Sequence, residues 1–185
     1  IILILVMGYL IQPLLLPIWK PEKLAAFYEK ISIEHKWEDQ KNHPLPQDFA
    51  DMLGWKELAD KVDSIYSTLP NQSQTLILCD NYGQAGAINY YTKNKNIRAN
   101  SFNADYINWF QLDKKYTNLI RVKSLESEGD ELIETSPFFD TAYVAGSITN
   151  AFSREYGTQI FVFLKATIDI NKRIRQEIED ERNYH

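Results

Sequence analysis

The chain has 185 residues, of which 44% are hydrophobic, 13% aromatic and 24% charged. This composition is too apolar for a disordered chain, and the length favours one domain or one domain with an appendage. The 20 Lys and Arg residues against 25 Asp and Glu residues give a formal net charge of −5, which disfavours binding to nucleic acid. A single cysteine, Cys79, excludes an internal disulfide and a zinc site built from cysteines.

Residues 1–19 contain no charged side chain and read IILILVMGYLIQPLLLPIW. A membrane-spanning helix needs about 20 apolar residues, and one in lipid tolerates some prolines such as Pro13 and Pro17. We therefore expect the end of a transmembrane helix, helical over 1–11, in a chain cut from a longer protein. A secretory signal peptide is disfavoured because a basic start and a small-residue cleavage site are missing. A buried core helix is the remaining alternative.

Residues 20–46 are charged and aromatic, and they end in the prolines Pro44 and Pro46, so we expect a linker there. The pattern then changes, because apolar residues recur at spacings of three and four. They are Trp55, Leu58, Val62, Ile65 and Leu69. This stripe predicts a helix with one apolar face, which ends at Pro70.

Short apolar runs alternate with helical patterns in the rest of the chain. The run Thr75–Cys79 is typical of a strand covered on both faces, and a helix is expected over 84–91. Further strands are expected at 96–102, 118–123, 141–148 and 159–164, and further helices at 104–111, 126–134 and 169–181. This order over 47–185 predicts an α/β domain with a Rossmann-like, mainly parallel sheet and flanking helices.

The turn that follows the Thr75–Cys79 strand is the candidate ligand site, because an open α/β sheet usually binds its ligand there. The three-glycine dinucleotide pattern and the phosphate-loop lysine are absent. The glycines of this turn can instead serve a tight turn and close helix packing. The candidate substrate-binding residues are Asn81, Tyr82, Gly83 and Gln84.

Other chemistry is not indicated by the residue pattern. His35 and His43 lie among carboxylates but lack the spacing of zinc ligands, so no metal is expected. Cys79 ends an apolar strand and is expected to be buried, and the chain has no Gly-x-Ser-x-Gly elbow for a serine nucleophile. The acidic residues of 126–134 are expected to form a solvated face.

Two stretches flank the helix expected after Trp55: LPQDFADMLGW at 45–55 and NYGQAGAINYY at 81–91. In order and spacing they resemble the C-terminal region of bacterial glycosyltransferases of the dolichyl-phosphate-mannose protein mannosyltransferase-like family. The Pro-containing segment Leu16–Trp19 is similar to the exit from that family's last membrane helix. Asp48 departs from many relatives, which carry His there. The resemblance covers 1–91 and extends further only by general pattern.

The resemblance implies an enzyme of the inner (cell) membrane that transfers a sugar from a polyprenyl phosphate to an acceptor outside the cytoplasm. Residues 1–19 would contact the lipid bilayer, and 20–185 would lie on the extracytoplasmic, periplasmic side. The family's catalytic carboxylate and donor site would lie in a preceding membrane region, so no residue of this chain is assigned as catalytic. This chain would hold no cofactor and would have an accessory or acceptor-side role.

Two other functions stay open at this stage. One is a single-span, membrane-anchored module that binds a sugar or nucleotide at the turn 81–86 without catalysis. The other is a soluble Rossmann-like enzyme such as a methyltransferase, which the missing glycine-rich loop and acidic ribose partner disfavour.

Overall fold

The computed structural model describes residues 1–125 and 127–184 and divides into two compact units. Unit 1 consists of Ile1–Leu53 and Asn150–Arg154, and unit 2 of Gly54–Thr149 together with the residues from Glu155 onward. The sequence pattern predicts that the α/β domain begins at residue 47, and residues 47–53 group with the segment that precedes them.

Unit 1 has short elements and a small core. Its elements are α1 (Ile2–Leu15), α2 (Pro21–Lys30), β1 (His35–Lys36), β2 (Asn42–His43) and α3 (Gln47–Ala50). Leu24, Tyr28 and Leu45 form the buried part of this core. The segment 20–46, expected as a linker, therefore carries a helix and an antiparallel two-stranded ribbon.

The prediction that 1–19 forms the end of a transmembrane helix is wrong. The helix α1 has 14 residues, which at 1.5 Å per residue is about 21 Å, whereas the hydrocarbon core of a bilayer measures about 30 Å. No helix in the described ranges combines the length and apolar character that a membrane span requires. The helix ends because Leu16, which precedes Pro17, has extended backbone angles (φ −127°, ψ 141°).

Unit 2 is built on a five-stranded sheet in the order β4-β3-β5-β7-β6. The strands are β3 (Thr75–Cys79), β4 (Ala99–Ser101), β5 (Asn118–Lys123), β6 (Phe139–Ser147) and β7 (Gln159–Ala166). Strands β3 and β5 have the predicted bounds, and the others overlap the predicted ranges.

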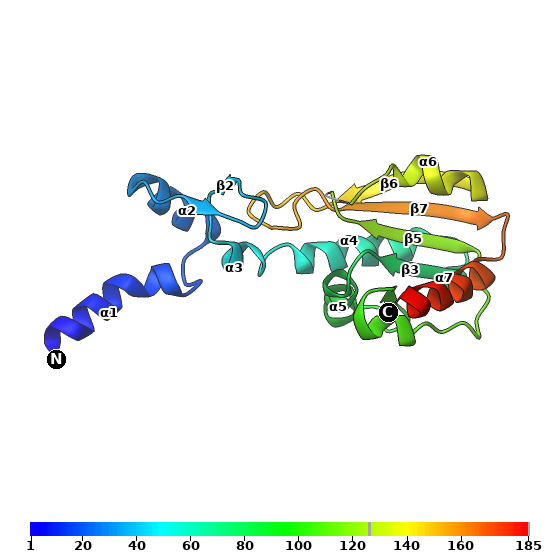
Figure 1. Ribbon diagram of the computed structural model, residues 1–185, viewed down its shortest axis with the longest axis horizontal. Coiled ribbons are helices and arrows are strands. Elements are labelled where there is room, and N and C mark those ends of the chain that lie inside the picture. The colour runs from blue at the N-terminus through cyan, green and yellow to red at the C-terminus, as the bar shows by residue number, and fades with distance from the viewer. Residues whose placement is uncertain (126, 185) are drawn as a thin grey trace. The chain divides into compact units, whose positions relative to one another are not determined.

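The helices of unit 2 surround this sheet (Figure 1). They are α4 (Trp55–Thr68), α5 (Tyr82–Tyr91), α6 (Glu131–Thr135) and α7 (Ile170–Tyr184), with 3-10 turns η1 (Gln72–Gln74), η2 (Ala104–Asn108) and η3 (Ser136–Phe138). The predicted helix at 126–134 begins later, as α6, and Glu126 lies outside the described residues. The predicted helix at 104–111 is the 3-10 turn η2.

The prediction of a Rossmann-like, mainly parallel sheet is wrong, because the sheet is mixed. Strand β3 pairs in parallel with β4 and β5, whereas β7 pairs antiparallel with both β5 and β6. The connection between β6 and β7 contains no helix in the described chain, and parallel neighbours usually need a helical crossover. Strand β7 therefore returns antiparallel and lies between β5 and β6.

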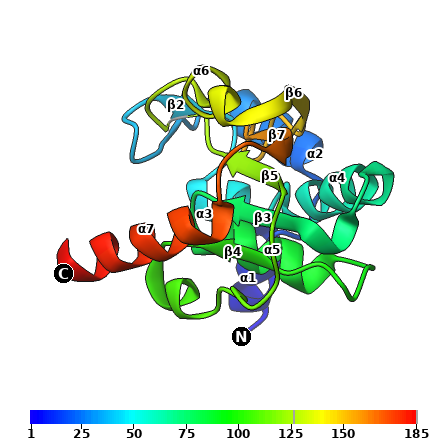
Figure 2. The same cartoon turned by 90° about the vertical axis from the view of Figure 1, so that its right-hand side faces the viewer.

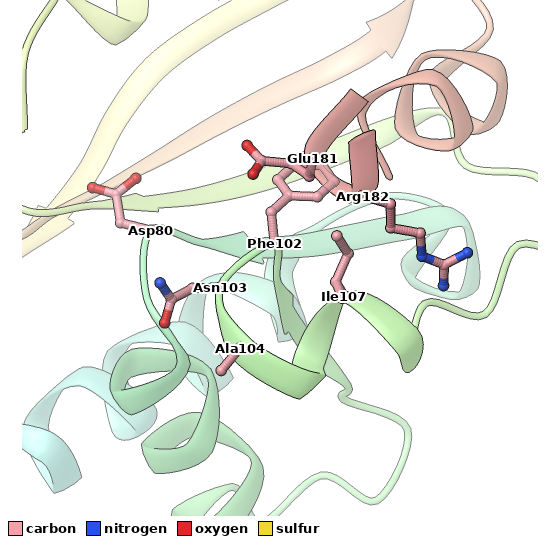
Figure 3. A pocket seen from close by; sticks show the side chains of 7 residues that line it. All are labelled: Asp80, Phe102, Asn103, Ala104, Ile107, Glu181 and Arg182. Carbon is pink, nitrogen blue, oxygen red and sulfur yellow. The ribbon is translucent and has the colours of Figure 1, made fainter. Parts of the chain in front are cut away.

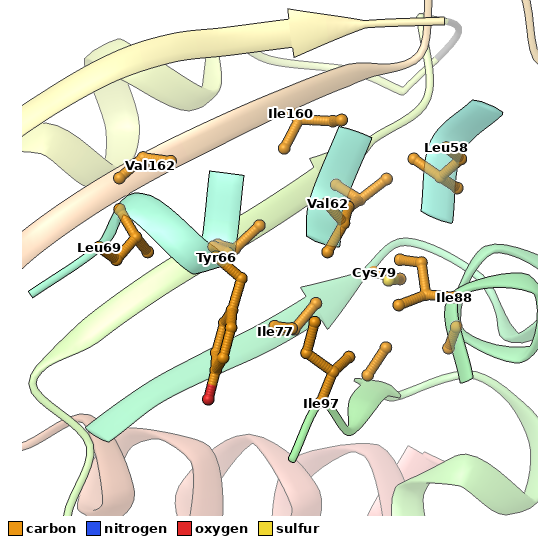
Figure 4. Packing of buried hydrophobic residues seen from close by; sticks show 14 of the residues in the cluster. Leu58, Val62, Tyr66, Leu69, Ile77, Cys79, Ile88, Ile97, Ile160 and Val162 are labelled. Carbon is orange, nitrogen blue, oxygen red and sulfur yellow. The ribbon is translucent and has the colours of Figure 1, made fainter. Parts of the chain in front are cut away.

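The two faces of the sheet pack against different helices (Figure 2). Ile77, Ile120 and Val162 lie in the cluster with α4 and α5, which Figure 4 shows from close by. The alternate positions, among them Leu76 and Phe163, pack on Ile170 and Ile174 of α7. Because successive strand residues point to opposite faces, β3 is buried along its whole length. The predicted helix stripe is confirmed from Leu58 onward, since Leu58, Val62 and Leu69 lie in the first cluster and Ile65 packs against it, whereas Trp55 is not part of that cluster.

Candidate functional site

The predicted site residues lie at the carboxyl end of β3, where α5 begins. Asn81 is the N-cap of α5, and its Oδ1 accepts a hydrogen bond of 2.9 Å from the Gln84 amide. The Ala85 amide donates to the Asn81 carbonyl at 3.2 Å. The Gln84 amide, which a helix start could offer to a phosphate, is therefore used inside the protein, while the Ala85 bond is the first within the helix.

Tyr82 is exposed, whereas Gly83 lies close to Trp55. The Tyr82 side chain is 57% exposed and is the accessible one of the predicted site residues. A Cβ atom placed on Gly83 would lie 3.4 Å from Cη2 of Trp55 and 3.1 Å from Oδ1 of Asn81. The missing side chain thus lets Trp55, the last residue of the stretch 45–55, approach Gly83 of the stretch 81–91.

Gln84 is fully buried and connects three segments of unit 2. Its Oε1 accepts from the Asp80 amide at 3.2 Å, while its Nε2 donates to Ser124 Oγ at 2.8 Å and Glu155 Oε2 at 2.9 Å. Through these hydrogen bonds the buried Gln84 side chain holds the turn in place. Binding at Asn81, Tyr82, Gly83 and Gln84 stays a prediction.

A charged network that the sequence did not indicate lies beside the turn. The Asp80 carboxylate accepts from the Arg121 guanidinium, from the Ser124 amide at 2.8 Å and from Ser127 Oγ at 2.6 Å. Arg121 also lies 3.5 Å from Glu131 Oε2. The side chains of Asp80 and Arg121 are 15% and 17% exposed, so the pair is largely removed from water.

Glu131 was expected on a solvated acidic face, and that expectation is wrong for this residue. It is 8% exposed and also lies 3.6 Å from Lys123 Nζ. Burying a carboxylate costs free energy unless charged or polar partners compensate, and β5 supplies them in Arg121 and Lys123. The sequence did contain a signal, namely these two cations next to apolar residues of one strand, since a charge in such a place needs a partner.

A pocket of about 460 Å³ opens next to Asp80 (Figure 3). It is lined by Asp80, Phe102, Asn103, Ala104, Ile107, Glu181 and Arg182. Ala104 has a positive φ of 54°, which is uncommon for a residue with a side chain. In Figure 3 the Arg182 side chain extends away from Asp80, and its Nη2 donates to Asn108 Oδ1 at 2.7 Å. An aromatic ring, an amide and carboxylates therefore surround this pocket.

The arrangement can bind a polar ligand more readily than it can activate a nucleophile. Cys79 is buried, and burial raises the pKa of its thiol, so the reactive thiolate is disfavoured. Within the described ranges, no group of three or more His, Cys, Asp or Glu side chains is placed to hold a metal ion. His43 pairs with Asp39 at 2.9 Å and stacks on Trp37, while burial lowers the pKa of His35.

Comparison of the chain with protein-family models, curated proteins and solved structures finds no match. These comparisons therefore lend no support to the assignment as a glycosyltransferase, which rests on the two stretches quoted above.

Proposed function

We propose that the chain is an accessory, acceptor-side part of an enzyme that transfers a sugar from a polyprenyl phosphate to an acceptor outside the cytoplasm. The observation that carries this proposal is the contact between Trp55 and Gly83 at the carboxyl end of β3. The two stretches of the resemblance are separate in the chain, yet Trp55 of the first approaches Gly83 of the second, three residues after Asp80, which lines the pocket. Such a contact is expected if both stretches serve one site.

The chemistry of this pocket supports binding of a sugar on the acceptor side. Sugar hydroxyls need hydrogen-bonding partners, which Asn103 and Glu181 offer, and the C–H face of a sugar packs on an aromatic ring such as Phe102. The carboxylate of Asp80 is engaged by Arg121 and by two serines, so it shapes the pocket without acting as a base.

The proposal assigns the donor lipid and the catalytic carboxylate to a membrane region outside this chain. The polyprenyl-phosphate sugar and its acceptor are thus partners of the whole enzyme. Contact of residues 1–19 with the lipid bilayer belongs to the same proposal. Its support is that α1 has no buried residue and exposes large apolar side chains, among them Ile2 and Leu5.

Sugar binding by the full chain tests the acceptor-side role. We would use saturation-transfer difference NMR with D-mannose and D-glucose as probes, and we expect a signal that Asn103→Ala and Glu181→Gln each reduce at least threefold. Glu179→Gln, an exposed residue on the same helix, is the matched control and should keep the signal. Equal signals from all variants, or no saturable signal, would contradict the acceptor-side role.

Transfer activity separates this proposal from its alternative, a sugar- or nucleotide-binding module without catalysis. Membranes from cells that express the complete gene should move labelled sugar from a polyprenyl phosphate, and Glu181→Gln should lower that rate. Sugar binding without any transfer would instead favour the non-catalytic module.

A further inference from the structure

A second pocket, of about 440 Å³, lies at the opposite end of the parallel strands, where β3 begins. Its walls come from the end of α4 and η1, from the loop that enters β4 and from the loop that enters β5. Its lining includes Thr75 and Ile77 of β3 and the side chains of Tyr66 and Tyr116. All of these residues belong to unit 2.

Three cations line this pocket, namely Lys95, Arg98 and Lys114, together with neutral polar groups such as Asn96 and Gln111. None of the described residues that line it is a carboxylate. Among the described residues, none of the three cations forms an ion pair. The chain as a whole carries a net charge of −5, so this grouping does not follow from its composition. The pocket is a local positive site on an acidic protein.

Hydrogen bonds hold the walls of this pocket in place. Tyr66 Oη donates to the Gln72 carbonyl at 2.8 Å, and Tyr116 Oη donates to the Gln111 carbonyl at 2.9 Å. Arg98 Nη1 donates to the Ile97 carbonyl at 2.9 Å, which orients the guanidinium beside the loop. Figure 4 shows Tyr66 extending from α4 alongside Ile77. Because these hydrogen bonds are made within the protein, the walls need little reordering to receive a ligand.

Neighbouring titratable groups leave the site positive at neutral pH. Burial raises the pKa of Tyr66, and burial followed by the charge of Asp113 raises the pKa of Tyr116. Both phenols therefore stay neutral and add no negative charge. Asp113 is an acidic neighbour of the pocket, because its charge contributes to the raised pKa of Tyr116. This one negative charge is smaller than the three positive charges of Lys95, Arg98 and Lys114.

We propose that this pocket binds a small phosphate-bearing ligand through Lys95, Arg98 and Lys114. A phosphate carries about −1.5 to −2 charges and three acceptor oxygens, which suits several converging cations better than a carboxylate would. The net negative charge of the protein repels an extended polyanion, whereas a small anion can enter a concave positive site. This inference concerns the other end of the sheet and is independent of the proposed function.

Isothermal titration calorimetry of the full chain with inorganic pyrophosphate tests the site. We expect saturable binding of one anion per chain, weakened at least about tenfold in Lys95→Gln/Arg98→Gln/Lys114→Gln. The matched control, Lys93→Gln/Lys115→Gln/Lys172→Gln, removes the same charge from exposed positions outside the pocket and should retain binding. Unchanged thermal midpoints in both triple variants show that they are folded.

A parallel measurement identifies the source of the phosphate. Sedimentation with phosphatidylcholine vesicles that contain phosphatidic acid tests a lipid headgroup, and pyrophosphate tests a soluble ligand. If the pocket variant loses binding to one probe while the control variant keeps it, the result supports the site. The probe that is lost shows whether the phosphate belongs to a lipid headgroup or to a soluble ligand. Absence of binding to both probes, or equal loss in both triple variants, would overturn it.

Discussion

The charged side chains at the carboxyl ends of β3 and β5 differ from those at the amino ends in burial and in ion pairing. At the carboxyl ends Asp80, Arg121 and Glu131 are largely buried, and each has a charged partner. At the amino ends Lys95, Arg98 and Lys114 are exposed and form no ion pair in the described chain. Buried, paired charges are costly to separate, whereas exposed cations contribute little to folding and can meet a ligand.

The largest effect is expected for Asp80→Ala at the carboxyl end. Removing this carboxylate leaves Arg121 with a single, longer ion pair to Glu131, and we expect the free energy of unfolding to fall by about 3 kcal/mol. Urea denaturation followed by circular dichroism measures it. Asp140→Ala, at an exposed position of β6, is the control and should change stability by less than about 0.5 kcal/mol. Equal effects would mean that the buried network does not stabilise this end.

Gln84→Leu should cost about 2 kcal/mol, because a fully buried amide is replaced and its three hydrogen-bonding partners lose a bond. Gln176→Leu, on the exposed side of α7, is the matched control. The same denaturation measurement applies to both variants. If the two variants are equally stable, then Gln84 is free to serve a ligand, as the sequence had predicted.

Glu57 adds a pH-dependent contribution at the carboxyl end. Burial alone would raise the pKa of Glu57, but hydrogen bonds from Lys61 and Thr149 outweigh burial and lower the pKa from 4.5 to about 2. A carboxyl group with a lowered folded-state pKa stabilises the protein above its unfolded pKa and loses that effect as pH falls through the folded pKa. The contribution is therefore complete above about pH 4.5 and is lost by about pH 2.

We expect Glu57→Gln to lower the free energy of unfolding by about 1–2 kcal/mol at pH 7, after allowance for the quarter of the side chain that meets solvent. The difference from the unmodified chain should shrink as the pH is lowered toward 2. Thermal unfolding at a series of pH values measures it. A difference that is constant with pH would show that the charge of Glu57 is not responsible.

The smallest effect is expected at the amino end. The triple variant Lys95→Gln/Arg98→Gln/Lys114→Gln should change the free energy of unfolding by less than about 0.5 kcal/mol, because exposed side chains without ion pairs contribute little. Denaturation in urea gives this value. If the free energy of unfolding falls as much as in Asp80→Ala, these cations stabilise the folded state. The two ends of the strands would then not differ in this respect.

Local patterns in the sequence predicted the elements well where burial is regular. The run Thr75–Cys79 became β3 with all five residues buried. The stripe from Leu58 to Ile65 became the inner face of α4, and Leu69, which follows the helix, lies in the same cluster. Patterns failed where the outcome depends on distant partners. Asp80 and Arg121 are 41 residues apart, and nothing near either residue indicates that they meet.

The sequence predicts a ligand site at the turn after β3, but it does not predict which other segments surround that turn. The turn after β3 does lie at the end of the parallel strands, beside a pocket. The pocket walls formed by Phe102 and Glu181 come from segments that the turn pattern does not include. The burial of Gln84 likewise depends on Ser124 and Glu155, which reach it from other segments.

By itself the amino-acid sequence determined that strands and helices alternate, the helix α4, the strands β3 and β5, and the placement of a turn where a ligand site is expected. Only the tertiary structure decided that β7 runs antiparallel between β5 and β6, that Glu131 is buried, and that Lys95, Arg98 and Lys114 line one pocket. The reason is physical. Apolar periodicity reports which side of an element is buried, but strand direction and converging charges depend on contacts between segments far apart in the chain.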